Sequence, residues 1–189
     1  GLPIKISSKQ NRSEILNING TEGSQFISGL LILSPFLERN TEIRVSNLTS
    51  RPYIDMTIAV LKEFKAEIVN NTDSIFQIRG NQKLGVNKIG LEGDWSNMAF
   101  HFVGAALSGE VSVSGIQIGS AQADKIVIDV LDSFGAKTET KSSGEIKVTS
   151  ASKNPFQVDL TDAPDLFPVL SVLACGANEI GRASCRERV

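Results

Sequence analysis

The stretch VLKEFKAEI, residues 60–68, returns 70 residues later as VLDSFGAKT, residues 130–138, and this recurrence decides the fold. The match continues without a gap, because IFQIRG at 75–80 falls on EIKVTS at 145–150 at the same spacing. Self-similarity at a fixed period is the signature of a structural unit that is used more than once. The sequence therefore predicts an internal duplication.

Both copies of the repeat carry the apolar stripe of a packed helix. Apolar residues three and four positions apart lie on one side of a helix and face the core together. Three such positions correspond between the copies: Ile54, Ile58 and Leu61 with Asp124, Ile128 and Leu131. The stripe is kept in the second copy except at its first member, where Asp124 stands in place of an aliphatic side chain.

The elements on either side of this helix extend the repeat to a β-α-β-α-β-β unit. Alternating apolar residues indicate strands, and a period of about 3.6 residues indicates helices. In the first copy we expect a strand at 13–18, a helix at 24–37, a strand at 41–47, a helix at 52–64 and a strand pair at 66–70 and 74–80. In the second copy we expect a strand at 88–94, a helix at 95–107, a strand at 110–117, a helix at 122–134 and a strand pair at 136–140 and 144–150.

A third copy begins and is not completed. A strand is expected at 154–160 and a helix at 161–175, whereas residues 176–189 carry no strand or helix pattern. The predicted fold class is therefore α/β (α+β), with two full copies of the unit and a partial third. A unit that begins and then stops favours a chain that is shorter than its parent protein.

The composition is that of an ordinary globular protein. Of the 189 residues, 41% are hydrophobic and 21% are charged, with a formal net charge of −2, and the chain is long enough to bury a core. No apolar run approaches the roughly 18 residues of a membrane span, and the slight acidic excess argues against a nucleic-acid partner. Cys175 and Cys185 have no spacing typical of a zinc site or a disulfide framework. We therefore expect a cytoplasmic protein without a nucleic-acid or membrane partner.

Three of the predicted helices begin with polar side chains. Ser24 and Gln25 open the first, SRPY at 50–53 opens the second, and Asp165 lies near the start of the helix in the third copy. Proline suits the first position of a helix, and the free N–H groups there favour an anion. Ser50 and Arg51 would lie where an anion is favoured, although a capped surface helix explains the same stretch.

The segments SQFISGLL (24–31), SRPYIDMT (50–57), LEGDWSN (91–97) and DAPDLFPVLSVLA (162–174) carry a family resemblance. On these motifs, from about residue 2 to about residue 178, the chain resembles the 5-enolpyruvylshikimate-3-phosphate (EPSP) synthases, which are enolpyruvyl transferases. The resemblance implies six β-α-β-α-β-β units, three in each of two domains of an inside-out α/β barrel, with substrates in the cleft between them. Residues 1–92 would then end the first domain, 93–180 would begin the second, and 181–189 would be a tail foreign to the family.

The activity and the site residues follow from the same resemblance. It implies transfer of the enolpyruvyl group of phosphoenolpyruvate to the 5-hydroxyl of shikimate 3-phosphate with release of phosphate, in aromatic amino acid (chorismate) biosynthesis. Ser24 and Ser50 would bind the phosphate of shikimate 3-phosphate, Gln25 would reach both substrates, and Tyr53 would lie against the shikimate ring. Asp165 would handle the proton of the attacking hydroxyl. No metal or organic cofactor is implied, and the full-length parent would be a monomer.

Several features depart from the family pattern. Gly23 stands where the family usually has a serine, so one phosphate contact is lost or is replaced by a backbone N–H. Lys65 stands where the family commonly has glycine, which requires backbone strain or a shifted helix end. The basic side chains that grip phosphoenolpyruvate in the family come from outside residues 1–178, and Arg182, Arg186 and Arg188 lie in a different context. We therefore expect this chain by itself to be inactive.

Two other functions stay open. A UDP-N-acetylglucosamine enolpyruvyl transferase shares the fold and the RP element but does not usually carry SQF or YIDMT, and a non-catalytic binding module could use the same fold. Among the remaining candidates, His101 is the single histidine and is expected to be structural, Cys175 is expected to be a small core residue, and Trp95 is expected to anchor packing.

Overall fold

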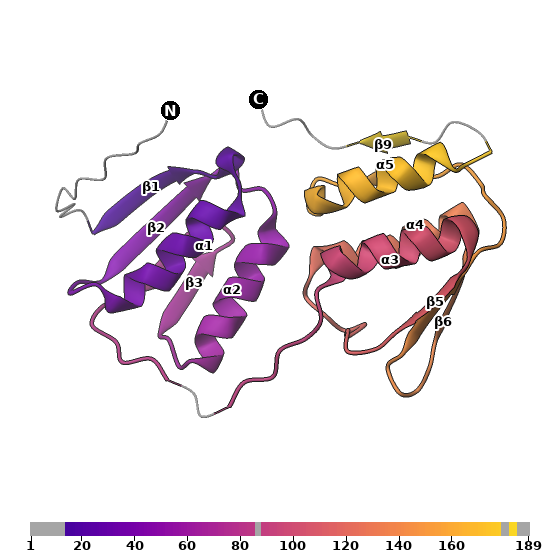
Figure 1. Ribbon diagram of the computed structural model, residues 1–189. Coiled ribbons are helices and arrows are strands. Elements are labelled where there is room, and N and C mark those ends of the chain that lie inside the picture. Colours follow the sequence, from indigo (N-terminus) through magenta and orange to yellow (C-terminus); the bar gives the residue numbers. More distant parts are fainter. Residues whose placement is uncertain (1–13, 86–87, 179–181, 185–189) are drawn as a thin grey trace, which may run out of the picture.

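The computed structural model describes residues 14–85, 88–178 and 182–184, and it consists of two halves that each pack helices on a small sheet (Figure 1). The first half comprises β1 (Ile15–Asn19), α1 (Ser24–Leu33), β2 (Thr41–Ser46), α2 (Arg51–Glu63), β3 (Ile68–Thr72) and β4 (Ile75–Ile78), with single 3₁₀ turns at Gly20–Glu22 and Ser34–Phe36. Its sheet has the order β1-β2-β4-β3, in which β1 is parallel to β2 and the other pairs are antiparallel.

The second half repeats this plan with shorter strands. It comprises α3 (Trp95–Ser108), β5 (Glu110–Val113), a 3₁₀ turn at Ala123–Ile126, α4 (Val127–Phe134), β6 (Lys137–Thr140), β7 (Ile146–Thr149), β8 (Gln157–Asp159), a 3₁₀ turn at Pro164–Leu166, α5 (Phe167–Cys175) and β9 (Arg182–Ser184). Its main sheet has the order β5-β7-β6 and is antiparallel, and β8 forms a separate parallel pair with β9.

The predicted duplication is confirmed by this topology. The order β2-β4-β3 of the first sheet recurs as β5-β7-β6 in the second, with the same antiparallel pairings. The helix and two strands α2-β3-β4 correspond to α4-β6-β7 at the spacing of 70 residues read from the sequence. The segment β8-α5-β9 also repeats the parallel β-α-β arrangement of β1-α1-β2.

Two strand predictions are wrong. Residues 88–94 form no strand, because the expected partner strand at 110–117 ends at Val113 and the chain turns at Gly115, whose φ is +89°. In place of a ladder of strand hydrogen bonds, the Gly93 N–H donates one hydrogen bond to the Gly115 carbonyl at 2.7 Å. In the other direction, residues 176–189 were expected to hold no strand, yet β9 lies there and pairs with β8.

The helices begin later or end earlier than periodicity predicts. The helix expected at 24–37 ends at Leu33, since Pro35 cannot donate a backbone hydrogen bond and the chain continues as a 3₁₀ turn. The helices expected from 122 and 161 begin at Val127 and Phe167, each after a 3₁₀ turn. Sequence periodicity does not distinguish such a turn from the first turn of an α-helix.

Each half has its own hydrophobic core, and the two clusters share no described residue. The first core joins α1 and α2 to the sheet and includes Ile27, Leu31, Ile43, Ile54, Ile58 and Phe76. The second joins α3, α4 and α5 to the second sheet and includes Trp95, Phe102, Leu131, Phe134, Val148 and Leu170. The stripe of the repeated helix is therefore buried in the first copy, and in the second copy Leu131 is buried and Ile128 is partly buried against the core. A division at 92/93 agrees with these clusters and stays a prediction.

Two single-residue expectations have clear outcomes, and the structural role expected of His101 stays a prediction. Trp95 is 1% exposed, and its Nε1–H donates to the Gln117 carbonyl at 3.1 Å, so its packing role is confirmed. Cys175 is exposed and was wrongly predicted to be a core residue, because the last residue of α5 faces away from the neighbouring Leu173 in the core. His101 lies on the exposed side of α3.

The strained helix end predicted at Lys65 is present. Lys65 has φ +66°, the left-handed conformation in which glycine is favoured. Its N–H donates to Lys62 O at 2.8 Å and the Ala66 N–H donates to Leu61 O at 2.9 Å, which is the Schellman pattern of a helix end. Gly135 occupies the corresponding place after α4, with φ +93°. No described helix is long and apolar enough to cross a membrane.

Candidate functional site

A pocket of about 190 Å³ gathers all five residues that the resemblance singles out. The side chains around it come from α1, α2 and the turn before α5: Ser24, Gln25, Ser28, Ser50, Tyr53, Met56, Thr57, Pro164 and Asp165. Ser50 and Asp165 are more than a hundred residues apart in the sequence, and the two halves of the molecule meet here. The fold therefore brings these polar residues together around one pocket, and the sequence patterns alone did not require this.

The N-terminus of α1 faces the pocket without a side-chain cap. Ser24 is the first residue of α1 and is 5% exposed, and the preceding Gly23 has φ +105° and ψ 164°. The Gly23 N–H donates to the Gly20 carbonyl at 3.3 Å, so this N–H is engaged within the protein. Because Gly23 stands where the family usually has a serine, one phosphate contact was expected either to be lost or to be replaced by a backbone N–H. The engaged Gly23 N–H disfavours the replacement.

Ser50 precedes α2 at the N-cap position, but its side chain makes no capping hydrogen bond and the residue is buried. Its side chain is 2% exposed and its hydroxyl has no hydrogen-bond partner among the described residues. Its backbone is in the left-handed region, with φ +52° and ψ 42°, which is unfavourable for a residue with a Cβ. A buried hydroxyl without a partner carries a desolvation cost and needs an explanation. The capped surface helix is therefore the wrong explanation of this stretch.

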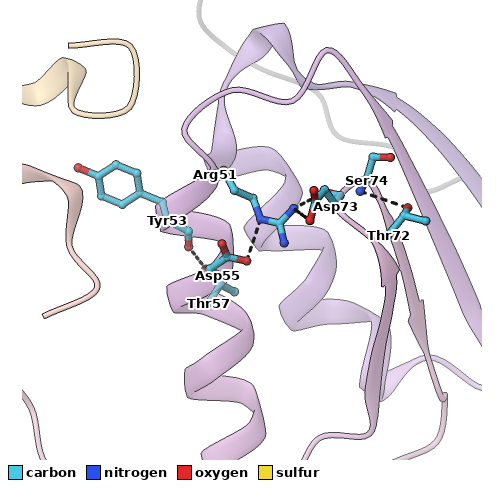
Figure 2. Close-up of polar contacts among 7 residues, drawn as sticks. All are labelled: Arg51, Tyr53, Asp55, Thr57, Thr72, Asp73 and Ser74. Atoms are coloured by element: carbon cyan, nitrogen blue, oxygen red, sulfur yellow. Dashed lines mark hydrogen bonds and ion pairs between the residues drawn. The ribbon is translucent and has the colours of Figure 1, made fainter. Parts of the chain in front are cut away.

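Arg51 turns away from the pocket and toward the β3–β4 turn (Figure 2). Its Nε lies 2.8 Å from Asp55 Oδ1, and its Nη1 lies 3.5 Å from Asp73 Oδ1 and donates to the Asp73 carbonyl. The guanidinium also lies 5.8 Å from the centre of the Phe76 ring. Its charge is used to hold α2 against the sheet. Arg51 therefore begins α2 at the N-terminus where it was expected, but its guanidinium is directed toward Asp55 and Asp73 and not toward the pocket.

Tyr53 points the opposite way, and its hydroxyl meets a buried carboxylate from the second half. The phenol donates to Asp124 Oδ1 at 3.0 Å, and the Ser96 hydroxyl donates to Asp124 Oδ2. Sequence reasoning did not identify Asp124 or Ser96 as part of this site. One signal in the sequence could have indicated Asp124: it is acidic, whereas the corresponding residue in the first copy, Ile54, is aliphatic.

Burial dominates the electrostatics of this contact. It raises the pKa of Asp124 above its ordinary value, while the hydrogen bonds from Ser96 and Tyr53 oppose the shift and the charges of Asp165 and Asp94 add to it. Burial likewise raises the pKa of the Tyr53 phenol, and the charge of Asp124 is the next cause. The phenol therefore remains protonated, and able to donate, throughout the neutral range.

Asp165 supplies a carboxylate at the other side of the pocket. It is exposed and lies in the 3₁₀ turn Pro164–Leu166, so it can reach a molecule in the pocket. Among the described residues that line the pocket, none is lysine or arginine. The site thus offers hydroxyls, an amide, a phenol and a carboxylate, which can bind a polyhydroxylated anion and accept a proton.

Comparison with known proteins gives consistent matches. The family model for EPSP synthase (3-phosphoshikimate 1-carboxyvinyltransferase) matches residues 1–186. The 3-phosphoshikimate 1-carboxyvinyltransferase of Methanocorpusculum labreanum is 38% identical over 181 residues, which cover 95% of this chain and 42% of the relative. The protein of the same name from Clostridium acetobutylicum is 38% identical over 174 residues, which cover 92% and 40%. The chain thus spans about 40% of the length of these relatives.

Solved structures show the same fold. An EPSP synthase from Acinetobacter baumannii superposes with a TM-score of 0.67 at 22% identity, over 89% of this chain and 40% of that one. The enolpyruvyl transferase NikO from Streptomyces tendae gives a TM-score of 0.63 at 15% identity, over 91% and 45%. At these sequence identities the structural similarity supports only the fold, an architecture of repeated α/β units.

Proposed function

Since the chain belongs to the EPSP synthase family, we propose that its pocket is a substrate site for enolpyruvyl transfer from phosphoenolpyruvate to shikimate 3-phosphate. The observation that carries this proposal is the Ser50 hydroxyl, which is buried, unpartnered among the described residues and on the pocket wall. A phosphate oxygen is the acceptor that would satisfy it. Ser24, at the uncapped N-terminus of α1, supports the same assignment.

The phosphate of shikimate 3-phosphate is assigned to Ser24 and Ser50. Both hydroxyls lie at or next to helix N-termini, where the macrodipole favours an anion. Hydrogen bonds to a charged acceptor are stronger than those between neutral groups. The two serines together would hold the phosphate, with Gln25 beside them on α1 and the Tyr53 ring against the carbocycle.

Asp165 is assigned to the proton of the attacking hydroxyl. In the proposed step the 5-hydroxyl oxygen forms a bond to the central carbon of phosphoenolpyruvate, whose methylene takes up a proton. The hydroxyl proton passes to the Asp165 carboxylate. The new methyl group then loses a proton while the carbon–oxygen bond to phosphate breaks, which forms the enol ether and releases inorganic phosphate. An exposed carboxylate in the pocket wall can approach that hydroxyl without rearrangement of the core.

The described pocket wall holds no cation for phosphoenolpyruvate. Fixing a second anion beside a first one requires compensating positive charge, because like charges repel strongly in a partly dehydrated site. We therefore infer that this chain by itself binds shikimate 3-phosphate and does not turn the two substrates over. The full-length parent is proposed to be a monomeric cytoplasmic enzyme without a nucleic-acid or membrane partner.

Calorimetric titration of the chain with shikimate 3-phosphate tests the proposal. Shikimate without its phosphate is the matched ligand control, and we expect it to bind much more weakly. Tighter binding of UDP-N-acetylglucosamine than of shikimate 3-phosphate would favour the sister transferase instead. Failure of both phosphorylated ligands to bind would favour a non-catalytic module.

A further inference from the structure

We propose that Asp124 is a positioning residue: its buried carboxylate holds the Tyr53 hydroxyl and thereby fixes the Tyr53 ring as a wall of the pocket. The proposal deepens the proposed function, and it rests on that function only where substrate binding is the readout.

Asp124 occupies a position where packing alone would select an aliphatic side chain. In the first copy of the repeat the same position is Ile54, and both residues are 0% exposed. Removing a carboxylate from water is costly unless its oxygens are bonded. Both oxygens of Asp124 do have donors, Tyr53 on one and Ser96 on the other. The carboxylate therefore serves contacts that an aliphatic residue could not make.

Tyr53 is held at both ends. Its backbone N–H donates to the Ser50 carbonyl at 3.2 Å. Its own carbonyl accepts from the Thr57 hydroxyl at 2.9 Å, and Figure 2 draws this second bond. Its hydroxyl is then fixed by Asp124 at the far end of the ring. A phenol that is anchored at its tip presents its ring to the pocket in one orientation.

The contact also joins the two sides of the pocket. Tyr53 belongs to the first half, whereas Asp124 and Asp165 belong to the second. Ser96 lies in the first turn of α3, directly after Trp95, which is buried in the second core. The bonds from Tyr53 to Asp124 and from Asp124 to Ser96 therefore run from the pocket wall to the core of the other half. Losing them would free Tyr53 to move relative to Asp165.

Alkaline titration of the chain tests the contact directly, because Tyr53 is the only tyrosine and Trp95 the only tryptophan. Asp124→Asn keeps the side chain's size and removes its charge. We expect the phenolate absorbance to appear about one pH unit lower in this variant than in the wild type, since a bond to a charged acceptor becomes one to a neutral acceptor. Trp95 fluorescence checks that both proteins remain folded.

The matched control is Asp129→Asn, an exposed aspartate on α4. This control should leave the titration of Tyr53 unchanged. The proposal is overturned if Asp124→Asn titrates like the wild type. It is equally overturned if Tyr53 of the wild type ionises near pH 10.0, its ordinary pKa, while Trp95 still reports a folded core.

A double-mutant cycle on shikimate 3-phosphate affinity tests the consequence for the pocket. Tyr53→Phe removes the hydroxyl and leaves the ring, and we expect this change and Asp124→Asn each to weaken binding about tenfold through lost pre-organisation. Because Asp124 acts through Tyr53, the double variant should bind like Tyr53→Phe alone. Fully additive losses would overturn the positioning role. Absence of binding to the wild-type chain would count against the proposed function, and the titration then decides the role of Asp124.

Discussion

Replacing Ser50 by alanine is expected to make the protein more stable and its ligand binding weaker. The Ser50 hydroxyl is 2% exposed and has no partner among the described residues, so the substitution removes no hydrogen bond from the free protein. It removes a desolvated polar group instead, which costs about 1–3 kcal/mol when unpaired. The left-handed backbone at φ +52° is equally unfavourable for both residues and does not contribute to the difference.

Ser50→Ala should stabilise the free protein, but it should weaken ligand binding. A hydrogen bond from the Ser50 hydroxyl to a phosphate oxygen contributes about 1.5–3 kcal/mol, as bonds to charged groups do. Its loss corresponds to roughly a 10- to 150-fold increase in the Kd for shikimate 3-phosphate. Urea unfolding followed by circular dichroism measures the first effect, and calorimetric titration measures the second.

Ser34→Ala is the matched control for this experiment. Ser34 is also buried, at 1% exposure, but its hydroxyl donates to the Leu30 carbonyl at 2.7 Å. Its removal should lower stability by about 1 kcal/mol and leave the affinity unchanged, since Ser34 is not on the pocket wall. If Ser50→Ala loses as much stability as Ser34→Ala and binds as the wild type does, Ser50 is a structural residue and the reasoning is refuted.

Four further substitutions have expected outcomes. In the full-length protein, Asp165→Asn should slow turnover by about 10²–10⁴ with substrate affinity kept, and steady-state kinetics showing near-normal kcat would exclude it as the proton acceptor. Lys65→Gly should stabilise the chain by about 1 kcal/mol in urea unfolding, because it relieves a left-handed φ. Its counterpart Gly135→Ala should instead destabilise, since the new Cβ would lie 2.0 Å from Ser152 Oγ; equal signs for the two would contradict this account. Gly23→Ser restores the usual family residue but at φ +105°, so it should cost about 1–3 kcal/mol of stability, and a stability-neutral variant would show that the backbone adapts.

Local patterns in the sequence predicted the elements of the fold well. The strand at 41–47 and the helix at 52–64 appear within a residue or two, because their periodicity reflects which side chains face the core. The strand expected at 88–94 is absent for a non-local reason: a strand requires a partner edge, and the neighbouring strand ends at Val113. The 182–184 strand was missed for the same reason, since its only signal is the presence of β8 beside it.

The sequence indicated which residues lie together, but not how they come together. The resemblance of the motifs singled out five residues, and all five line one pocket: Ser24, Gln25, Ser50, Tyr53 and Asp165. It could not reveal that Ser50 is buried without a partner, because burial depends on how α1, α2 and the turn before α5 meet. The contact between Tyr53 and Asp124 likewise joins residues 71 positions apart, and no periodic pattern encodes it.

The two copies of the unit differ at the N-termini of their first helices. At the spacing of 70 residues, EGS at 22–24 falls on EGD at 92–94, so Ser24 and Asp94 are counterparts. Asp94 caps α3 by accepting from the N–H groups of Ser96 at 2.9 Å and Asn97 at 3.3 Å, which closes that helix N-terminus and places a negative charge there. Ser24 makes no such bond, and the N-terminus of α1 stays available to an anion. The first copy thus has no side-chain cap on α1, whereas in the second copy Asp94 caps α3 and Asp124 accepts from Tyr53.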